Sequence, residues 1–281
     1  MTPKPLRSVL FLPAGNARAV QKARTLPCDA VVLDLEDATG PEHKDFARAA
    51  AVQALSDGGF GERTVAVRVN ALDTRWGADD LAALRSARPD AIVAPKVGSA
   101  GDVRDYAGRL PDGVCLWAMV ETCRGVLCLR DIVGASERLA ALVVGTNDLS
   151  KDMRRPLGPD RRALHAALSA AVLAARSCGL QVVDGVFNAL EDPDGLRAEA
   201  EEGRAFGFDG KSLIHPSQIE AANRAFSPSE EEAAWARAVA AAYADPVNAE
   251  AGAIRLEGRM VERLHLEEAR RILSLVEGNM D

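Results

Sequence analysis

The chain has 281 residues, of which 48% are hydrophobic and 27% are charged, and this composition excludes a wholly disordered protein. Its formal net charge of −7 argues against a protein whose main task is to coat nucleic acid or anionic lipid, and an aromatic content of 4% argues against a stacking platform for single strands. The length fits either two ordinary domains or one large α/β barrel.

Neither the N-terminal stretch nor the cysteines indicate export. The opening residues MTPKPLRSVLFLP lack the long apolar segment and cleavage site of a signal peptide, and no stretch approaches the ~18 apolar residues of a membrane span. We therefore expect a cytoplasmic protein. The five cysteines show no CxxC pair, so we expect small buried side chains in a reducing compartment rather than disulfides or a zinc site; they are Cys28, Cys115, Cys123, Cys128 and Cys178.

Eight short runs rich in Val, Ile and Leu recur along the chain, and each is followed by a helix-like stretch. Near-continuous apolar runs of this length are typical of parallel strands buried on both faces. The predicted strands are residues 7–12, 30–35, 64–69, 91–94, 114–120, 141–144, 181–186 and 210–214.

The stretches between these runs have helical spacing, clearest over residues 42–55, 160–177 and 193–205. Helix starts are indicated by Asn16, Asp79 and Asp192, and a helix end by Gly179. Alternating strands and helices predict right-handed βαβ units and a parallel sheet.

Eight such units within residues 1–226 predict an α/β fold, a TIM (β/α)8 barrel that contains the active site. A doubly wound open sheet is the alternative. The turn Pro13-Ala-Gly-Asn16 holds one glycine, however, so a dinucleotide-binding fingerprint is not supported.

The pattern changes after Phe226, and residues 227–281 predict a mainly helical C-terminal extension. Ser229 is the expected N-cap of a helix that runs to Tyr243. A short strand at Ile254–Leu256 and a last helix over Leu264–Val276 follow. About 55 residues are few for independent folding, so we expect this extension to pack on the barrel or on a neighbouring subunit.

Polar residues gather where the predicted strands end, which in a barrel is the edge that carries the chemistry. Each of them has an ordinary structural alternative as a helix N-cap or a loop charge. The residues are Glu36, Asp37, Arg68, Asn70, Lys96, Glu121, Asn147, Asp148, Asp184 and His215.

Glu121 and Asp148 end adjacent predicted strands, which lie ~4.8 Å apart. Glu121 continues an apolar run, where an unpaired carboxylate is costly. Two carboxylates, waters and a bidentate 2-oxo acid form the hard oxygen set that Mg²⁺ prefers, and the metal then acts as a Lewis acid on the carbonyl. Backbone N–H groups at Asn147 and Asp148 are expected to hold the substrate carboxylate if a helix starts there.

Three further strand-end residues leave alternatives open. Arg68 suits a carboxylate or an enolate-like oxygen, and a salt bridge to Glu36 or Asp37 is compatible with that role. Lys96 is either a Schiff-base lysine or, the favoured interpretation, the partner of those acidic residues in a buried ion pair. We expect His215 to be a loop or cap residue, with a catalytic role as the alternative.

Six blocks of sequence resemble the citrate lyase β-subunit-like group of the HpcH/HpaI aldolase superfamily, which is related to malyl-CoA and citramalyl-CoA lyases. The resemblance covers essentially the whole chain, and the order of the blocks is more specific than any one of them. The blocks are residues 7–38, 67–81, 94–97 (APKV), 119–122 (MVET), 144–154 (VGTNDLSKDMR) and 207–219 (GFDGKSLIHPSQI).

The resemblance implies a Mg²⁺-dependent TIM barrel, with Mn²⁺ able to substitute, that makes or breaks a carbon–carbon bond in a 3-hydroxyacyl thioester. The products would be an acyl-CoA and a 2-oxo acid. By motif, Glu121 and Asp148 resemble the metal ligands, and Arg68 resembles the residue that contacts the oxo acid and steadies the enolate. Glu36 and Asp37 resemble supporting groups around them.

The resemblance also makes Arg18 and Lys22 candidates for CoA phosphate contacts, with an exposed helix face as the alternative. In malyl-CoA-lyase-like relatives, a C-terminal Gly-x-Met-(Ile/Val)-Asp segment reaches over a neighbouring subunit's pocket and supplies an acid/base carboxylate. This chain has Gly258-Arg-Met-Val-Glu262, with Glu in place of that Asp. Glu262 is therefore a candidate catalytic residue, or else a surface charge.

Four functions remain open at this stage: a lyase on CoA thioesters, the β subunit of a citrate lyase acting on a carrier-protein thioester, an aldolase without CoA, and a non-catalytic CoA- or metal-binding regulator. The retention of Glu121, Asp148 and Arg68 disfavours the regulator. We expect a homo-oligomer, a trimer or hexamer, with no nucleic-acid or membrane partner.

Overall fold

The computed structural model describes residues 4–277 except 157 and 159. The chain divides into two compact units, the first ending at Phe226 and the second beginning at Ser227. Each unit is described by itself. No helix among the described residues is both long and apolar enough to cross a membrane.

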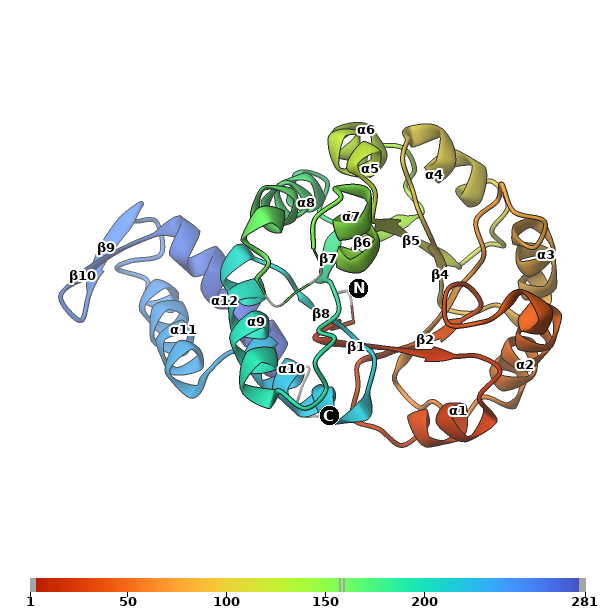
Figure 1. Ribbon diagram of the computed structural model, residues 1–281. Coiled ribbons are helices and arrows are strands. Elements are labelled where there is room, and N and C mark those ends of the chain that lie inside the picture. The colour runs from red at the N-terminus through yellow and green to blue at the C-terminus, as the bar shows by residue number, and fades with distance from the viewer. Residues whose placement is uncertain (1–3, 157, 159, 278–281) are drawn as a thin grey trace. The chain divides into compact units, whose positions relative to one another are not determined.

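The first unit is a closed barrel of eight parallel strands that pair in chain order, with β8 closing on β1 (Figure 1). Each predicted strand is found, with bounds that differ by at most two residues. The strands are β1 (Ser8–Pro13), β2 (Ala30–Asp34), β3 (Thr64–Arg68), β4 (Ala91–Ala94), β5 (Cys115–Val120), β6 (Leu139–Val144), β7 (Gln181–Asp184) and β8 (Gly210–Leu213). The TIM-barrel prediction is therefore confirmed.

Alternate strand residues enter two separate cores, as the two-residue period of a strand requires. In β2, Ala30 and Val32 belong to the cluster that fills the barrel, whereas Val31 and Leu33 belong to the layer between sheet and helices. The other inward-facing residues of the barrel cluster include Val9, Ala66, Val93, Trp117, Met119, Val143 and Val183. The next inward position along each strand lies at the carboxyl end of the barrel, where the site is built.

Helices surround the barrel (Figure 1). They are α1 (Ala17–Ala23), α2 (Lys44–Asp57), α3 (Gly77–Ala87), α4 (Ala100–Ala107), α5 (Cys123–Leu127), α6 (Leu129–Val133), α7 (Thr146–Asp152), α8 (His165–Ser177), α9 (Pro193–Phe206) and α10 (Ile219–Phe226), with 3-10 turns η1 (Pro41–His43), η2 (Arg162–Leu164) and η3 (Pro216–Gln218). The predicted caps Asn16 and Asp192 are confirmed, because each side chain accepts a backbone N–H of its helix.

The predicted helix start at Asp79 is wrong. Helix α3 begins at Gly77, with Trp76 at the N-cap, and Asp79 lies within the first turn. A Cβ at Gly77 would lie 2.4 Å from the carbonyl oxygen of Ala71, so a tight loop sets this start rather than an acidic cap.

The second unit consists of α11 (Glu230–Ala244), the hairpin β9 (Ala253–Leu256) and β10 (Arg259–Glu262), and α12 (Arg263–Glu277). Ser229 caps α11 through a capping box with Glu232, as expected. Strand β10 was not predicted; it pairs antiparallel with β9 across the Glu257-Gly258 turn, where both residues have positive φ. The core of this unit is formed by Ala236, Val239, Tyr243, Val261, Leu266 and Ala269.

The cysteines differ in part from the expectation. All five are free, which agrees with the absence of a predicted disulfide framework. Cys28 is buried as predicted, Cys123 and Cys128 are half-buried, and the prediction is wrong for Cys115 and Cys178, which are exposed. Cys115 is the first residue of β5 and Cys178 is the C-cap of α8, and element ends are readily reached by solvent.

Candidate active site

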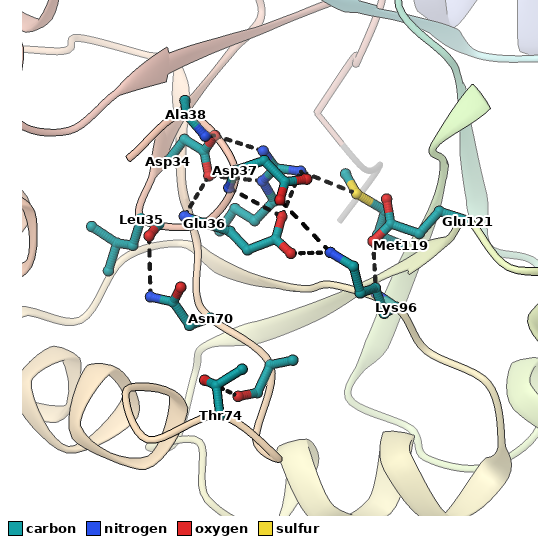
Figure 2. A network of polar contacts seen from close by, with 12 residues as sticks. Asp34, Leu35, Glu36, Asp37, Ala38, Asn70, Thr74, Lys96, Met119 and Glu121 are labelled. Carbon is teal, nitrogen blue, oxygen red and sulfur yellow. Dashed lines mark hydrogen bonds and ion pairs between the residues drawn. The ribbon is translucent and has the colours of Figure 1, made fainter. Parts of the chain in front are cut away.

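Three charged side chains occupy the inward positions directly above the barrel core. Each comes two residues after a residue of the barrel core: Asp34 after Val32 of β2, Arg68 after Ala66 of β3, and Glu121 after Met119 of β5. The strand period that places the apolar neighbours inside the barrel therefore turns these three charges toward its mouth. Figure 2 shows the resulting network of polar contacts.

These residues border a cavity of about 420 Å³ at the carboxyl end of the barrel. The structure thus brings together most of the predicted site, since Asp37, Arg68, Glu121, Asn147 and Asp148 all contribute to its wall. The other described lining residues are Phe11, Leu12, Pro13, Asp34, Ala38, Met119, Val144, Gly145, Thr146, Val186, Ser212 and Ile214.

Arg68 is held mainly by Asp34, a contact that the sequence analysis missed. Its Nε and Nη2 donate to the two carboxylate oxygens of Asp34 at 2.7 and 2.6 Å. Burial alone would lower the pKa of Arg68, but the hydrogen bonds and charge of Asp34 outweigh it and raise that pKa above its usual range. The guanidinium therefore keeps its charge and a fixed plane.

The predicted salt bridges of Arg68 to the acidic pair are confirmed. Its Nη1 lies 3.1 Å from Glu36 Oε2 and 3.8 Å from Asp37 Oδ2. The same nitrogen donates to the sulfur of Met119 at 3.6 Å, which is a weak acceptor. Nη1 is the guanidinium nitrogen that does not bind Asp34, so a ligand oxygen would share it with Glu36.

Lys96 forms an ion pair with Glu36, and its Nζ lies 3.9 Å from Asp37 Oδ1 (Figure 2). The predicted ion pair is confirmed, but it is not buried as expected, because the Lys96 side chain is 40% exposed. Burial would lower the pKa of Lys96, but the hydrogen bond and charge of Glu36 prevail and raise it. A Schiff-base lysine needs the opposite shift, so the contacts argue against that alternative.

Glu121 is 1% exposed, and its Oε1 accepts a hydrogen bond from the backbone N–H of Lys96 at 2.7 Å. Burial, with a smaller contribution from the charge of Glu36, raises the pKa of Glu121 to about 8. The Glu121 carboxyl group is therefore costly to ionise until a cation binds beside it.

The donor set fits Mg²⁺. Asp148 lies half-buried in the first turn of α7 and lines the same cavity as Glu121. Within residues 4–277, leaving aside 157 and 159, no group of three or more His, Cys, Asp and Glu side chains could hold a metal. Proteins commonly bind Mg²⁺ through one or two carboxylates and leave its other coordination positions to water and substrate.

The remaining predicted residues have defined places. The Asn147 and Asn188 side chains are exposed and hydrogen-bonded to each other at 3.2 and 2.8 Å. Arg18 and Lys22 are exposed on α1. Glu262 ends β10 in the second unit, where its N–H donates to His265 at 2.9 Å. The substrate, CoA and acid/base roles of these residues stay predictions.

His215 is the N-cap of η3, in a capping box with Gln218, and this confirms its expected cap role. Near it in the fold, Lys211 of β8 and Asp184 of β7 are both fully buried and lie 3.2 Å apart. Arg161 Nη1 lies 2.8 Å from Asp184 Oδ2, and Glu199 Oε1 lies 2.6 Å from Lys211 Nζ. These charges join the last two strands to α9.

Two residues that support the site were missed. Lys44 of α2 is buried, and its Nζ donates to the carbonyl oxygens of Leu35 and Glu36 at 2.8 and 2.7 Å, which holds the loop after β2. Nothing in the helical pattern distinguishes this lysine. Asp34 was detectable, because a carboxylate within the run Ala30–Leu35 carries the same cost that drew attention to Glu121.

The chain is similar to known proteins over nearly its whole length. The family model for HpcH/HpaI aldolase/citrate lyase matches residues 7–216. The chain is 46% identical to a (3S)-malyl-CoA thioesterase of Cereibacter sphaeroides over 97% of this chain and 95% of that protein. It is 34% identical to citrate lyase subunit beta of Escherichia coli K12, over 96% and 93% of the two chains.

Among solved structures, CitE from Mycobacterium tuberculosis in complex with magnesium, acetoacetate and coenzyme A is similar, with a TM-score of 0.81 and 32% identity over 98% of this chain and 99% of that one. The family model covers well over half of the chain, and the relatives match nearly its whole length. On these grounds the chain belongs to the HpcH/HpaI aldolase/citrate lyase family.

Proposed function

We propose that this protein is a Mg²⁺-dependent carbon–carbon lyase that cleaves, or forms, a 3-hydroxyacyl-CoA thioester of the malyl-CoA or citramalyl-CoA type. The observation that carries the proposal is the buried Glu121 beside Asp148 and Arg68 in one cavity. The similarity to a malyl-CoA thioesterase and to a CitE bound to magnesium and coenzyme A supports the choice of a CoA thioester.

The charges of the cavity favour a small 2-oxo acid with one carboxylate, such as glyoxylate or pyruvate. Among the described lining residues, Arg68 is the one basic side chain, against four acidic ones. Its Nε and Nη2 are already bound to Asp34. An additional carboxylate, as in oxaloacetate, would meet no further basic side chain among the described lining residues, so we place malyl-CoA and citramalyl-CoA before a citryl thioester.

In the cleavage direction, the substrate hydroxyl gives its proton to solvent water, the carbon–carbon bond breaks, and the electron pair passes to the thioester as an enolate. Glu121 and Asp148 would hold the Mg²⁺ ion, which would polarise the substrate hydroxyl that becomes the carbonyl. Arg68, fixed by Asp34, directs an N–H at the developing negative oxygen. Glu262 of a partner subunit protonates the enolate carbon and releases the acyl-CoA.

This scheme gives the second unit a role as a lid on the active site of a neighbouring subunit in a homo-oligomer, a trimer or hexamer. On the outward face of β10, Met260 is 70% exposed and is followed two residues later by Glu262. A strand places residues two apart on the same face, so an apolar contact and a carboxylate are offered together. Arg18 and Lys22 would meet the CoA phosphates.

A second candidate is hydrolysis of the thioester, which the 46% identity to a malyl-CoA thioesterase favours. Both reactions are tested with one panel of malyl-, citramalyl-, methylmalyl- and citryl-CoA, with and without Mg²⁺. We expect an acyl-CoA and a 2-oxo acid from a lyase, and free CoA with the hydroxy acid from a thioesterase. Tight binding of Mg²⁺ and CoA without turnover of any thioester would refute both and favour a binding protein.

A further inference from the structure

Lys96 has a backbone conformation that residues with a side chain rarely adopt. It follows Pro95 at the exit of β4, and its φ is +52°. The left-handed region crowds Cβ against the following carbonyl oxygen, so glycine is the usual occupant. Arg88 and Glu257 share this conformation at a helix C-cap and in a hairpin turn, where it is common. Lys96 instead lies at the candidate active site. Strained backbone conformations cluster at such sites, where they take part in function.

Lys96 makes two contacts with the site (Figure 2). Its N–H donates to Glu121 Oε1 at 2.7 Å, while its ammonium pairs with Glu36. The first contact depends on the backbone dihedrals and not on the type of side chain. The second depends only on the ammonium. The two contributions can therefore be separated by mutation.

Gly145 packs against the other oxygen, Oε2, of the Glu121 carboxylate. A Cβ at Gly145 would lie 2.4 Å from Glu121 Oε2 and 2.6 Å from the Cβ of Glu121. Gly145 directly precedes α7, the helix that carries Asp148. Oε2 of Glu121 thus occupies space beside the start of α7 that is open because residue 145 is a glycine. Oε1 instead accepts the N–H of Lys96.

We propose that Lys96 is a positioning residue that holds Glu121 so that a single carboxylate oxygen, Oε2, is offered to the metal. This inference rests on the metal site of the proposed function. Mg²⁺ takes six ligands in a strict octahedron, whereas Ca²⁺ takes six to eight and readily accepts a bidentate carboxylate. Holding Oε1 on an N–H therefore favours Mg²⁺ and Mn²⁺ over Ca²⁺.

The test compares Lys96→Gly with Lys96→Val in the full-length protein. Both variants lose the ammonium, but glycine accepts the left-handed region and the β-branched valine disfavours it. Mn²⁺ affinity is measured from the electron paramagnetic resonance signal of free Mn²⁺, with Mg²⁺ and Ca²⁺ as competitors. We expect Lys96→Val to bind Mn²⁺ about tenfold more weakly than Lys96→Gly and to show a smaller preference for Mg²⁺ over Ca²⁺.

The matched control is the same pair of substitutions at Arg88, an exposed helix C-cap with φ +44°. Arg88→Gly and Arg88→Val should differ in thermal stability but not in Mn²⁺ affinity. If Lys96→Val does not fold, Gly145→Ala replaces it, with an expected loss of about tenfold in Mn²⁺ affinity because its Cβ displaces Oε2.

Equal Mn²⁺ affinity in the two Lys96 variants, or unchanged affinity in Gly145→Ala, would overturn this inference without affecting the proposed function. A wild-type protein that binds Mn²⁺ but cleaves no thioester would overturn the lyase proposal alone. A wild-type protein that binds neither Mn²⁺ nor Mg²⁺ would overturn both.

Discussion

Glu121→Gln tests whether the buried carboxylate of Glu121 destabilises the metal-free protein, and whether a bound metal removes this destabilisation. The folded protein raises the pKa of Glu121 from an ordinary 4.5 to about 8, chiefly by burial. Between these values the folded state holds a proton that the unfolded state has released. The metal-free protein must therefore lose stability as the pH rises from 4.5 to about 8, and the loss is complete above the folded pKa.

The magnitude follows from the width of that interval. At pH 7 the protein is about 2.5 pH units above the ordinary pKa, and each unit is worth 1.36 kcal/mol, so the penalty is about 3 kcal/mol. Glutamine has nearly the same shape, its carbonyl oxygen can accept the N–H of Lys96, and it carries no charge. We expect metal-free Glu121→Gln to be more stable than wild type by up to about 3 kcal/mol at pH 7 and by less than about 1 kcal/mol at pH 5.

Urea unfolding at both pH values, with and without Mg²⁺, measures these differences. Mg²⁺ should stabilise the wild type and leave Glu121→Gln unchanged, because a ligand stabilises only the state that binds it. Asp148→Asn is the control: this side chain is half-buried, so its substitution should remove the Mg²⁺ effect without stabilising the metal-free protein. A Glu121→Gln variant that is less stable than wild type at pH 7 without metal would refute the reasoning.

Three further outcomes are expected. Asp34→Asn weakens the bidentate hold on Arg68 and should lower kcat/KM about 10- to 100-fold in steady-state assays, with a smaller change in thioester KM; full activity would deny Asp34 a positioning role. Lys211→Met leaves Arg161 as the cation that Asp184 and Glu199 share and should cost about 3 kcal/mol in urea unfolding, and a neutral result would contradict this. Tyr243→Phe removes a buried 2.9 Å hydrogen bond to the main chain of β10 and should cost about 1 kcal/mol, visible as faster proteolysis of the second unit.

The strand and helix pattern was predictable because it follows from local composition. Buried parallel strands require continuous apolar runs, and helices require a 3.6-residue period, so both leave a direct trace in the chain. The exceptions are short elements. Helices α5, α6 and α7 have five to seven residues each, which is too few for a helical period to be recognised, and the β10 sequence Arg-Met-Val-Glu contains no apolar run.

The location of the site was predictable for a related reason. In a parallel barrel all strands end at the same edge, so polar residues after apolar runs must gather there whatever their partners are. This rule alone brings Glu121, Asp148 and Arg68 to one cavity. The partners themselves obey no such rule. Asp34 binds Arg68 across 34 positions of sequence, and Lys96 reaches Glu36 across 60.

The sequence by itself thus determined the barrel, the edge that carries the chemistry and the residue types gathered there, because period and burial act locally along the chain. Only the tertiary structure decided which oxygen of Glu121 is bound, which carboxylate fixes Arg68, and that Lys44 holds the loop after β2. These contacts depend on strand register, on side-chain rotamers and on one left-handed backbone residue, and all three are settled when distant segments pack together.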